Sequence, residues 1–176
     1  TITVLPSGRK SSVYAATILR RDYLQPVELK EKRPGVTFGF VIPKTDIGAP
    51  PIVTSGETKT VGVGQFAKAA DLKQGFSVSF DGYINVPVDG IYEFQVESTW
   101  DATILVGGER LMDVGGTKDR TFRAEVVPLK AGLHKISLRY NNLGGEPLFR
   151  VRWGIKGQGL RVIGGGARSE TWMRIK

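Results

Sequence analysis

Cysteine is absent from this sequence of 176 residues, and histidine occurs once, at His134. The lack of cysteine excludes disulfide bonds and thiolate chemistry, and one histidine cannot form the Cys/His clusters typical of zinc sites. No apolar run approaches the ~20 residues that a membrane-spanning helix needs. We therefore expect neither a zinc-type metal site nor a membrane span.

Acidic residues are fewer than basic ones, 17 against 25, which gives a net charge of +8. Such a balance permits contact with an anionic polymer but says nothing about fold. The segment 28–33 mixes both signs, whereas a nucleic-acid arm is typically a purer basic block with aromatic residues. We predict no nucleic-acid binding. Alternation leaves open whether four arginines form a basic stripe or are solvated separately: Arg123, Arg139, Arg150 and Arg152.

Turn-forming residues are abundant, with 23 glycines and 9 prolines among short runs in which apolar and polar residues alternate. The clearest run covers 76–106, where Phe76, Val78 and Phe80 alternate with polar neighbours, as in a strand with one buried face. This pattern predicts an all-β protein. The expected strands are 36–42, 76–80, 84–86, 92–96, 103–106, 121–129, 133–140, 148–153 and 170–176, with a helical turn at 67–72.

Gly-containing segments are interpreted as connections between these strands. We expect Asp81-Gly82 to break or bulge a strand, and Asp89-Gly90 to form a tight hairpin. Segment 46–59 is predicted to be a loop. Residues 115–118 resemble the end of a phosphate-binding loop, but a strand follows them and not a helix, so a hairpin turn is favoured.

Three spaced motifs carry a resemblance to a known family: F-x-G-Y-I-x-V-P-x-D-G-x-Y-x-F at 80–94, ILVGGERLMD at 104–113 and LKAGLHKISLRY at 129–140. Together they resemble the domain named after anthrax protective antigen. The resemblance implies an antiparallel β-sandwich that serves as an accessory module in glycosidases, adhesins and toxins. Several members of that family bind carbohydrate, so a glycan is the expected partner.

The N-terminal residues carry a second resemblance. VLPSGRKSSVYAATI at 4–18 is similar to the last strands of the small β-sandwich that follows the catalytic barrel in bacterial β-N-acetylhexosaminidases, glycoside hydrolases of family 20. YLQPVELKEKRPGVTFGF at 23–40 resembles the linker that follows in such enzymes. We therefore expect a β-hairpin ending a small β-domain at 1–22, a linker at 23–35 and the sandwich at 36–176.

This second resemblance also predicts the setting of the module. It implies a glycoside hydrolase that is periplasmic, on the cell surface or extracellular, with the catalytic domain of the parent chain as a further partner. Glycosidic chemistry needs two carboxyls that face one cleft, whereas the aspartates of this sequence mostly lie at predicted turns. We accordingly expect no enzymatic activity in this region.

The first resemblance raises the question of a calcium cofactor. Sugar-binding members of the family hold calcium with two adjacent aspartates in the loop after the second of these strands. Here the two positions are Thr99 and Trp100, and Asp101 follows. Calcium takes six or more oxygen ligands, so the loss of both carboxylates makes a calcium site doubtful, and we predict no cofactor.

The loop around Trp100 is nevertheless the candidate ligand site. Its indole can stack on a pyranose ring while Glu97 and Asp101 accept hydrogen bonds from sugar hydroxyls, with Asp113 as a neighbour. The alternative is that Trp100 only caps the sandwich, in which case the module is structural and packs against its catalytic domain or a dimer partner. His134 is expected to be buried and bonded to a backbone carbonyl or a carboxylate.

Overall fold

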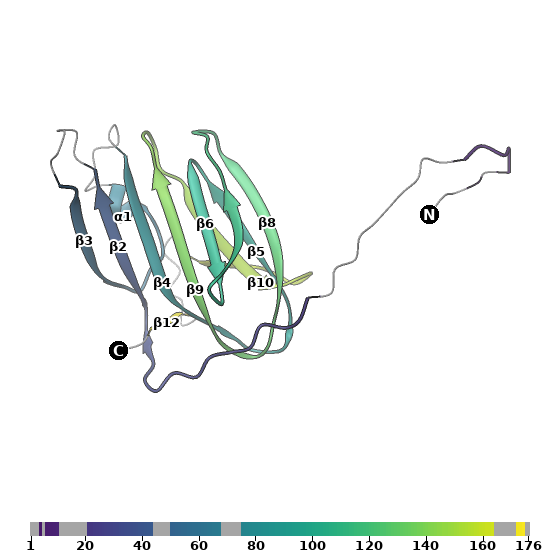
Figure 1. The fold of residues 1–176 in the computed structure, drawn as a ribbon, viewed down its shortest axis with the longest axis horizontal. Helices are drawn as coiled ribbons and strands as arrows, with labels where there is room; N and C mark the ends of the chain where they lie inside the picture. The colour runs from purple at the N-terminus through teal and green to yellow at the C-terminus, as the bar shows by residue number, and fades with distance from the viewer. Residues whose placement is uncertain are drawn as a thin grey trace.

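The computed structural model describes residues 4, 6–10, 21–43, 50–67, 75–163 and 172–174, with backbone alone for 161–163 and 172–174. Two antiparallel sheets pack face to face (Figure 1). The larger sheet contains β1 (Arg33–Pro34), β2 (Val36–Ile42), β3 (Ile52–Thr58), β4 (Phe76–Val86), β6 (Asp101–Val106), β7 (Glu109–Val114), β9 (Gly132–Asn142) and β12 (Trp172–Arg174). The smaller sheet contains β5 (Gly90–Ser98), β8 (Thr121–Leu129), β10 (Phe149–Ile155) and β11 (Arg161–Ile163). The predicted all-β antiparallel sandwich is confirmed.

Strand order places the longest pair at the centre of the larger sheet. β4 pairs with β9 along its whole length, from Phe76 opposite Asn142 to Val86 opposite Gly132. β2 and β3 extend this sheet on one side, and β6 and β7 extend it on the other. In the smaller sheet the order is β11-β10-β5-β8. Figure 1 shows β5 and β10 as a second layer behind β9.

Alternation within these strands produces the core between the sheets. The inward residues of β4 and β9 include Phe80, Ile84 and Leu138, all at most 1% exposed. Phe94 and Trp153 cover them from the smaller sheet, with their rings stacked at 5.8 Å between centroids. Each large apolar side chain buried in this way contributes about 1.5–3 kcal/mol, so the period-two pattern accounts for the stability of both layers.

Two of the predicted turns differ from the structure. β4 continues through Asp81 and Gly82 with regular pairing to β9, so the predicted break is wrong. The Asp81 carboxylate accepts hydrogen bonds from Ser137 Oγ at 2.5 Å and from Arg139 Nη1 at 3.2 Å, which stabilises the pair across the strands. The Asp89-Gly90 turn connects β4 to β5 in the opposite sheet, so it joins two layers and forms no hairpin.

Two other predicted connections also differ from the structure. Segment 115–118 leads from β7 in the larger sheet to β8 in the smaller one, so the predicted hairpin is wrong, although the predicted strand follows it. Segment 46–59, predicted as a loop, contains the edge strand β3. Both errors arise because pairing partners are decided by contacts distant in the sequence, which local turn residues do not encode.

Some predictions fall partly outside the described residues. Of the predicted hairpin in 1–22, the structure describes a bridge between Val4 and Lys10. The predicted helical turn at 67–72 lies almost wholly outside the described residues, and the short helix α1 (Gly64–Ala67) precedes it. Within the described part of the chain, no helix has the length and apolarity to span a bilayer.

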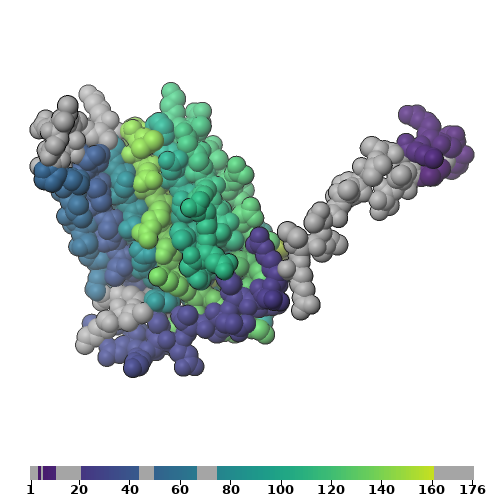
Figure 2. All heavy atoms as spheres, in the orientation of Figure 1, coloured from purple at the N-terminus to yellow at the C-terminus, as the bar shows by residue number. Residues whose placement is uncertain are grey.

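Residues 21–35 lie along one end of the sandwich, which we call the base (Figures 1 and 2). The amide of Leu24 donates to Pro128 O at 3.0 Å, and the amide of Val27 donates to Leu133 O at 2.8 Å. The carbonyl of Leu24 accepts from Lys130 N at 3.1 Å. The segment predicted as a linker therefore has its backbone bonded to the sandwich, while the domain boundary at 35/36 stays a prediction.

His134 is buried on the core side of β9 near the base, at 1% exposure. Its Nε2 lies 2.8 Å from the carbonyl oxygen of Lys130, four residues earlier. The prediction of a buried imidazole bonded to a backbone carbonyl is confirmed. His134 thus helps to fix the turn between β8 and β9.

Candidate functional site

Three connections gather at the end of the sandwich opposite the base, which we call the loop end: residues 99–100, 115–120 and 143–148. Backbone hydrogen bonds join them. The amide of Thr99 donates to Leu148 O at 3.0 Å, and the amide of Trp100 donates to Thr117 O at 2.7 Å. The short connection between β5 and β6 therefore lies in the middle and holds the other two loops.

Thr99 closes the core at this end. Its Oγ1 accepts the amide of Leu148 at 3.0 Å and lies 3.2 Å from the hydroxyl of Tyr140. Tyr140 is fully buried, and its ring stacks on Phe149 at 5.3 Å. Burial raises the pKa of the Tyr140 phenol above its usual value, although hydrogen bonds with Thr99 and Leu148 act in the opposite direction. The Thr99 hydroxyl is thus committed to structure.

Trp100 has an unusual backbone conformation. Its φ is +57°, and it is the only non-glycine residue of the described chain with positive φ. For a bulky side chain this left-handed conformation costs about 1–3 kcal/mol. The indole Nε1 donates to Gly144 O at 2.6 Å, so the ring is fixed as well as the backbone. The side chain is half-buried, which leaves part of the indole exposed at the loop end.

Asp101 begins β6 directly beside this tryptophan. It is half-buried and pairs with Asn141 of β9. Its carboxylate makes no hydrogen bond or ion pair with any residue that the structure describes. A Cβ at Gly116 would lie 3.9 Å from Asp101 Oδ1, so the loop backbone passes close to the carboxylate. The loop end therefore combines a fixed indole with a carboxylate whose acceptor capacity is unused.

The other two predicted site residues, Asp113 and Glu97, lie on the outer faces of the two sheets. Asp113 is on the outer face of the larger sheet, where it accepts from Thr103 Oγ1 and Arg110 Nη1, both at 2.8 Å. Glu97 is on the outer face of the smaller sheet and is only 7% exposed. Trp100 and Asp101 are thus neighbours at the loop end, Asp113 lies diagonally from Asp101 on the same outer face, opposite Thr103, and Glu97 lies on the opposite side of the sandwich.

Comparison with known families gives one match. The PA14 domain matches residues 41–165, which is most of the chain. The chain belongs to the PA14 domain family. Comparison with curated protein sequences gives no match.

Solved structures agree with the PA14 fold. The PA14 domain of the MpAFP antifreeze protein has a TM-score of 0.51 at 16% identity, with 57% of this chain and 53% of that one covered. An anti-sigma factor domain-containing protein from Clostridium clariflavum has a TM-score of 0.64 at 22% identity, with coverage of 97% and 58%. The epithelial adhesin 9 A domain from Candida glabrata, in complex with Galβ1-4GlcNAc, has a TM-score of 0.63 at 10% identity, with coverage of 88% and 97%.

These likenesses concern the fold. The chain spans about half the length of the first solved structures that it matches. The comparisons therefore establish the PA14 sandwich and leave the activity of any longer protein to be proposed from the site.

The loop end of this PA14 domain does not fit calcium. At the two positions where the family resemblance implies aspartates, Thr99 offers a hydroxyl already bonded within the core, and the Trp100 side chain offers no oxygen. Asp101 supplies the side-chain carboxylate next to them in the chain. No group of three or more His, Cys, Asp or Glu residues in the described part of the chain is arranged to hold a metal. One carboxylate is far from the six or more oxygens that calcium takes.

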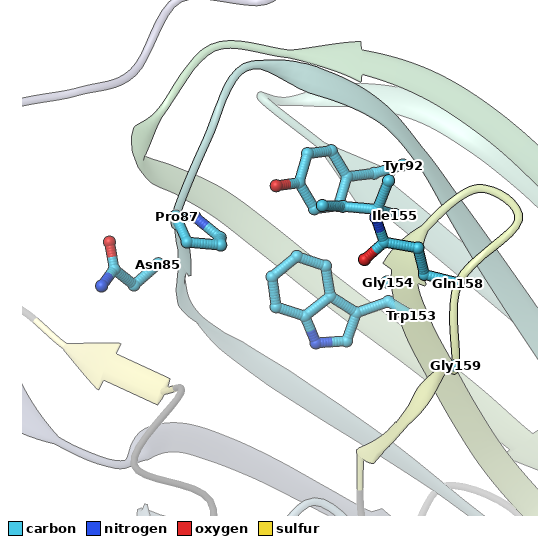
Figure 3. A pocket seen from close by; sticks show the side chains of 8 residues that line it. All are labelled: Asn85, Pro87, Tyr92, Trp153, Gly154, Ile155, Gln158 and Gly159. Atoms are coloured by element: carbon cyan, nitrogen blue, oxygen red, sulfur yellow. The ribbon is translucent and has the colours of Figure 1, made fainter.

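A concavity lies near the base. It is a cleft of about 100 Å³ between the sheets, where the Gln158 amide points toward the rings of Tyr92 and Trp153 (Figure 3). Both rings are at most 3% exposed. Binding pockets for small molecules usually have about 300–1,000 Å³, so this cleft is too small for a sugar ring.

The residues that position Trp100 were not found from the sequence. Thr117 and Gly144 receive its two N–H groups through backbone carbonyls, which carry no side-chain signal. A weak signal does exist for the loop itself. The Asn142 side chain accepts from Gly144 N at 3.0 Å and donates to Gly145 O at 2.9 Å, a turn typical of an Asn followed by glycines.

Proposed function

We propose that this PA14 domain is a non-catalytic carbohydrate-binding or substrate-shaping accessory module, with its loop end as the ligand face. The observation that carries the proposal is Trp100. A bulky residue held in a strained conformation by two hydrogen bonds is a feature that concentrates at ligand sites. The neighbouring Asp101 carboxylate has no partner among the residues that the structure describes, so we infer that it accepts hydrogen bonds from a ligand.

The geometry suits a sugar. The exposed part of the indole offers an apolar surface to the C–H face of a pyranose, and the Asp101 carboxylate offers two oxygens to its hydroxyls. Hydrogen bonds to a charged group contribute about 1.5–3 kcal/mol each. With one aromatic surface and one carboxylate we expect weak binding, with a Kd of about 0.1–1 mM, which corresponds to about 4–5.5 kcal/mol. Calcium is not required for either contact.

The wider setting is also proposed. The Candida glabrata adhesin domain of similar fold was solved with a disaccharide, which supports a glycan as the ligand. The resemblance of residues 4–18 to family 20 glycoside hydrolases supports an exported β-N-acetylhexosaminidase as the parent protein, whose catalytic domain is then a covalent neighbour. In that setting the module is periplasmic, on the cell surface or extracellular, and holds substrate near the catalytic domain.

The test is binding of neutral chitin-type and mucin-type oligosaccharides by calorimetry, with and without a chelator. Trp100→Ala removes the stacking surface, and Asp101→Asn removes the charge while keeping the shape. Tyr23→Ala is the matched control, because Tyr23 is an aromatic residue, 40% exposed, in the segment along the base and outside the loop end. We expect at least tenfold weaker binding in the first two variants, no change in the control, and no effect of the chelator.

A second function has its own supporting observation. Residues 21–35 are bonded to the base through Leu24 and Val27, as expected of a structural module that orders the polypeptide beside it. If no oligosaccharide binds to the wild-type chain, the loop-end proposal is wrong and the structural role is favoured. If oligosaccharides bind but Trp100→Ala has no effect, the ligand face lies elsewhere on the sandwich.

A further inference from the structure

The outer face of the smaller sheet carries an ordered arrangement of charged and aromatic side chains. Strand register places three of them in one row, Phe122 on β8, Glu97 on β5 and Arg150 on β10. The next row contains Ala124, Gln95 and Arg152. We call these six residues, together with Arg120, the arginine face.

Glu97 is the centre of this face. It is 7% exposed, which is low for a carboxylate on the outside of a sheet. Its Oε1 ion-pairs with Arg120 Nε, and its Oε2 lies 3.6 Å from Arg150 Nη1. The two guanidinium groups remain largely exposed, with 70% and 57% of their side chains accessible. One buried carboxylate therefore holds two arginines that present their remaining N–H groups to solvent.

Arg152 adds a third cation. It is exposed and makes no ion pair or hydrogen bond with any residue that the structure describes. The arginine face thus contains three arginines and the single carboxylate of Glu97, an excess of two positive charges, and Glu93 in the following row accepts a hydrogen bond from Gln95 at 2.5 Å. Because Arg150 and Arg152 alternate on one strand, their backbones are about 7 Å apart along it. Their long side chains can therefore reach two acidic groups of one extended polymer.

The other predicted members of a basic stripe are not part of this face. Arg139 lies on the outer face of the larger sheet, where it pairs with Asp81 at 3.2 Å. Arg123 pairs in register with Val96, so it belongs to the opposite side of β8. Of the four arginines considered from the sequence, only Arg150 and Arg152 lie on this face, and Arg120 joins them through its ion pair with Glu97.

Phe122 gives the face an apolar part. Its ring is 57% exposed and lies beside a shallow depression of about 10 Å³ that Gln95, Glu97, Phe122, Arg150 and Arg152 line. Guanidinium groups bind carboxylates through paired N–H donors, and an aromatic ring accepts the apolar face of a sugar. A single-stranded nucleic acid usually needs several aromatic residues for successive bases, and this face has one.

We propose that the arginine face is a second glycan site, which binds an extended polysaccharide bearing carboxylates. The choice of a glycan as the polymer rests on the proposed function, but the surface is separate from Trp100 and uses none of its residues. Arg150 and Arg152 pair with successive carboxylates of the polymer, and Phe122 contacts one of its sugar rings. Glu97 is a positioning residue, because it orients Arg120 and Arg150 without touching the ligand.

The test uses hyaluronan as the probe, with carboxyl-reduced hyaluronan as the ligand control. Arg152→Gln and Arg150→Gln each remove one charge from the face. Arg139→Gln is the matched control, since it removes the same charge from an exposed arginine on the other outer face. We expect a five- to tenfold loss of affinity in the first two variants, less than twofold in the control, and no binding of the reduced polymer.

Two further readouts separate this site from others. Binding should weaken as salt increases, with a shallower dependence in Arg152→Gln because fewer counterions are exchanged. Trp100→Ala should leave hyaluronan binding unchanged, and Arg152→Gln should leave neutral oligosaccharide binding unchanged, so each proposal can fail alone. Equal losses in Arg139→Gln and Arg152→Gln, equal affinity for a single-stranded oligonucleotide, or no hyaluronan binding would each overturn the proposal.

Discussion

At the base, the sandwich is covered by backbone: Leu24 and Val27 bond to main-chain groups of β8 and β9. At the loop end, side chains add to the backbone bonds of Thr99 and Trp100, through the Thr99 hydroxyl and the Trp100 indole, while Asp101 has no partner in the described chain. Backbone bonds tolerate many sequences, whereas side-chain bonds depend on particular residues. The comparison indicates that recognition can vary at the loop end while the base keeps the fold together.

The largest effect is expected from Gly75→Ala at the loop end. Gly75 has φ +74°, and a Cβ there would overlap the backbone carbonyl of Asn142, which cannot move without disturbing β9. We expect a loss of about 3 kcal/mol or more in the free energy of unfolding, measured with urea. Gly115→Ala is the control, because Gly115 has no atom within 4 Å of an added Cβ. A change below 1 kcal/mol for Gly75→Ala would show that this end adapts more than the structure indicates.

The corresponding change at the base is Gly132→Ala. Gly132 has φ +125°, and an added Cβ would lie 2.6 Å from the Cβ of Pro26. Since Pro26 belongs to a surface segment that can shift, we expect a smaller loss, about 2 kcal/mol. The amide of Val27 should also exchange with solvent faster by hydrogen-exchange mass spectrometry.

Gly108→Ala is the control for this prediction. Gly108 has φ +89° but no atom within 4 Å of an added Cβ, so it reports the backbone strain without the clash. If Gly108→Ala accelerates exchange at Val27 as much as Gly132→Ala does, then contact with Pro26 is not what holds the segment.

Tyr140→Phe tests the hydrogen bonds that close the loop end. It removes a buried hydroxyl bonded to Thr99, for a loss of about 1 kcal/mol near neutral pH. Because burial raises the pKa of Tyr140, the folded state holds the phenolic proton more tightly than the unfolded state does. This contribution is complete below the unfolded pKa of about 10 and is lost as pH rises through the folded value.

Urea unfolding between pH 8 and pH 11 measures this effect. The stability difference between the wild type and Tyr140→Phe should shrink above about pH 10, where the unfolded phenol ionises. Lysine titration affects both proteins equally and cancels. A difference that stays constant over this range would mean that the phenol is accessible to water at the loop end.

The smallest effect is expected for an exposed ion pair at the base. Lys130 Nζ lies 2.7 Å from Asp89 Oδ2, and the amide of Ala131 donates to Asp89 Oδ1 at 2.8 Å. The ammonium and then the amide lower the pKa of Asp89 below its ordinary value. Its contribution to stability is present above the ordinary value of 3.8 and is lost as pH falls through the folded pKa.

Lys130→Gln should raise the pKa of Asp89 toward 3.8, measured by NMR titration of its carboxyl carbon. Lys118→Gln, in the loop end, should leave that pKa unchanged. An unchanged pKa in Lys130→Gln would show that the ion pair does not form in solution.

Much of the fold could be predicted because its strands are half-buried. The period-two pattern gave the bounds of β2 and β8 as the structure has them. β3 was missed because it is an edge strand whose residues are mostly exposed on both faces, so no alternation marks it. The Asp89-Gly90 turn was recognised, but the sheet that each flanking strand joins depends on long-range packing.

The candidate site was predictable only in part. Trp100 and Asp101 adjoin in the sequence and remain together in space. Glu97 is close in sequence but lies on the outer face of the smaller sheet, because the chain passes from one sheet to the other between Ser98 and Asp101. The carbonyl of Gly144, which fixes the indole, lies 44 residues away and could be found only from the fold.

The pairing of β1 with β12 has a consequence for how this module is connected. Arg33 lies opposite Arg174, so the strand that leads into the sandwich and the strand that ends it run side by side at the base (Figure 1). Tension applied at these two points would load the short β1–β12 ladder and leave the central strands relaxed. A circular permutant in which β12 is joined directly to β1, with new termini placed within 115–120, should therefore fold.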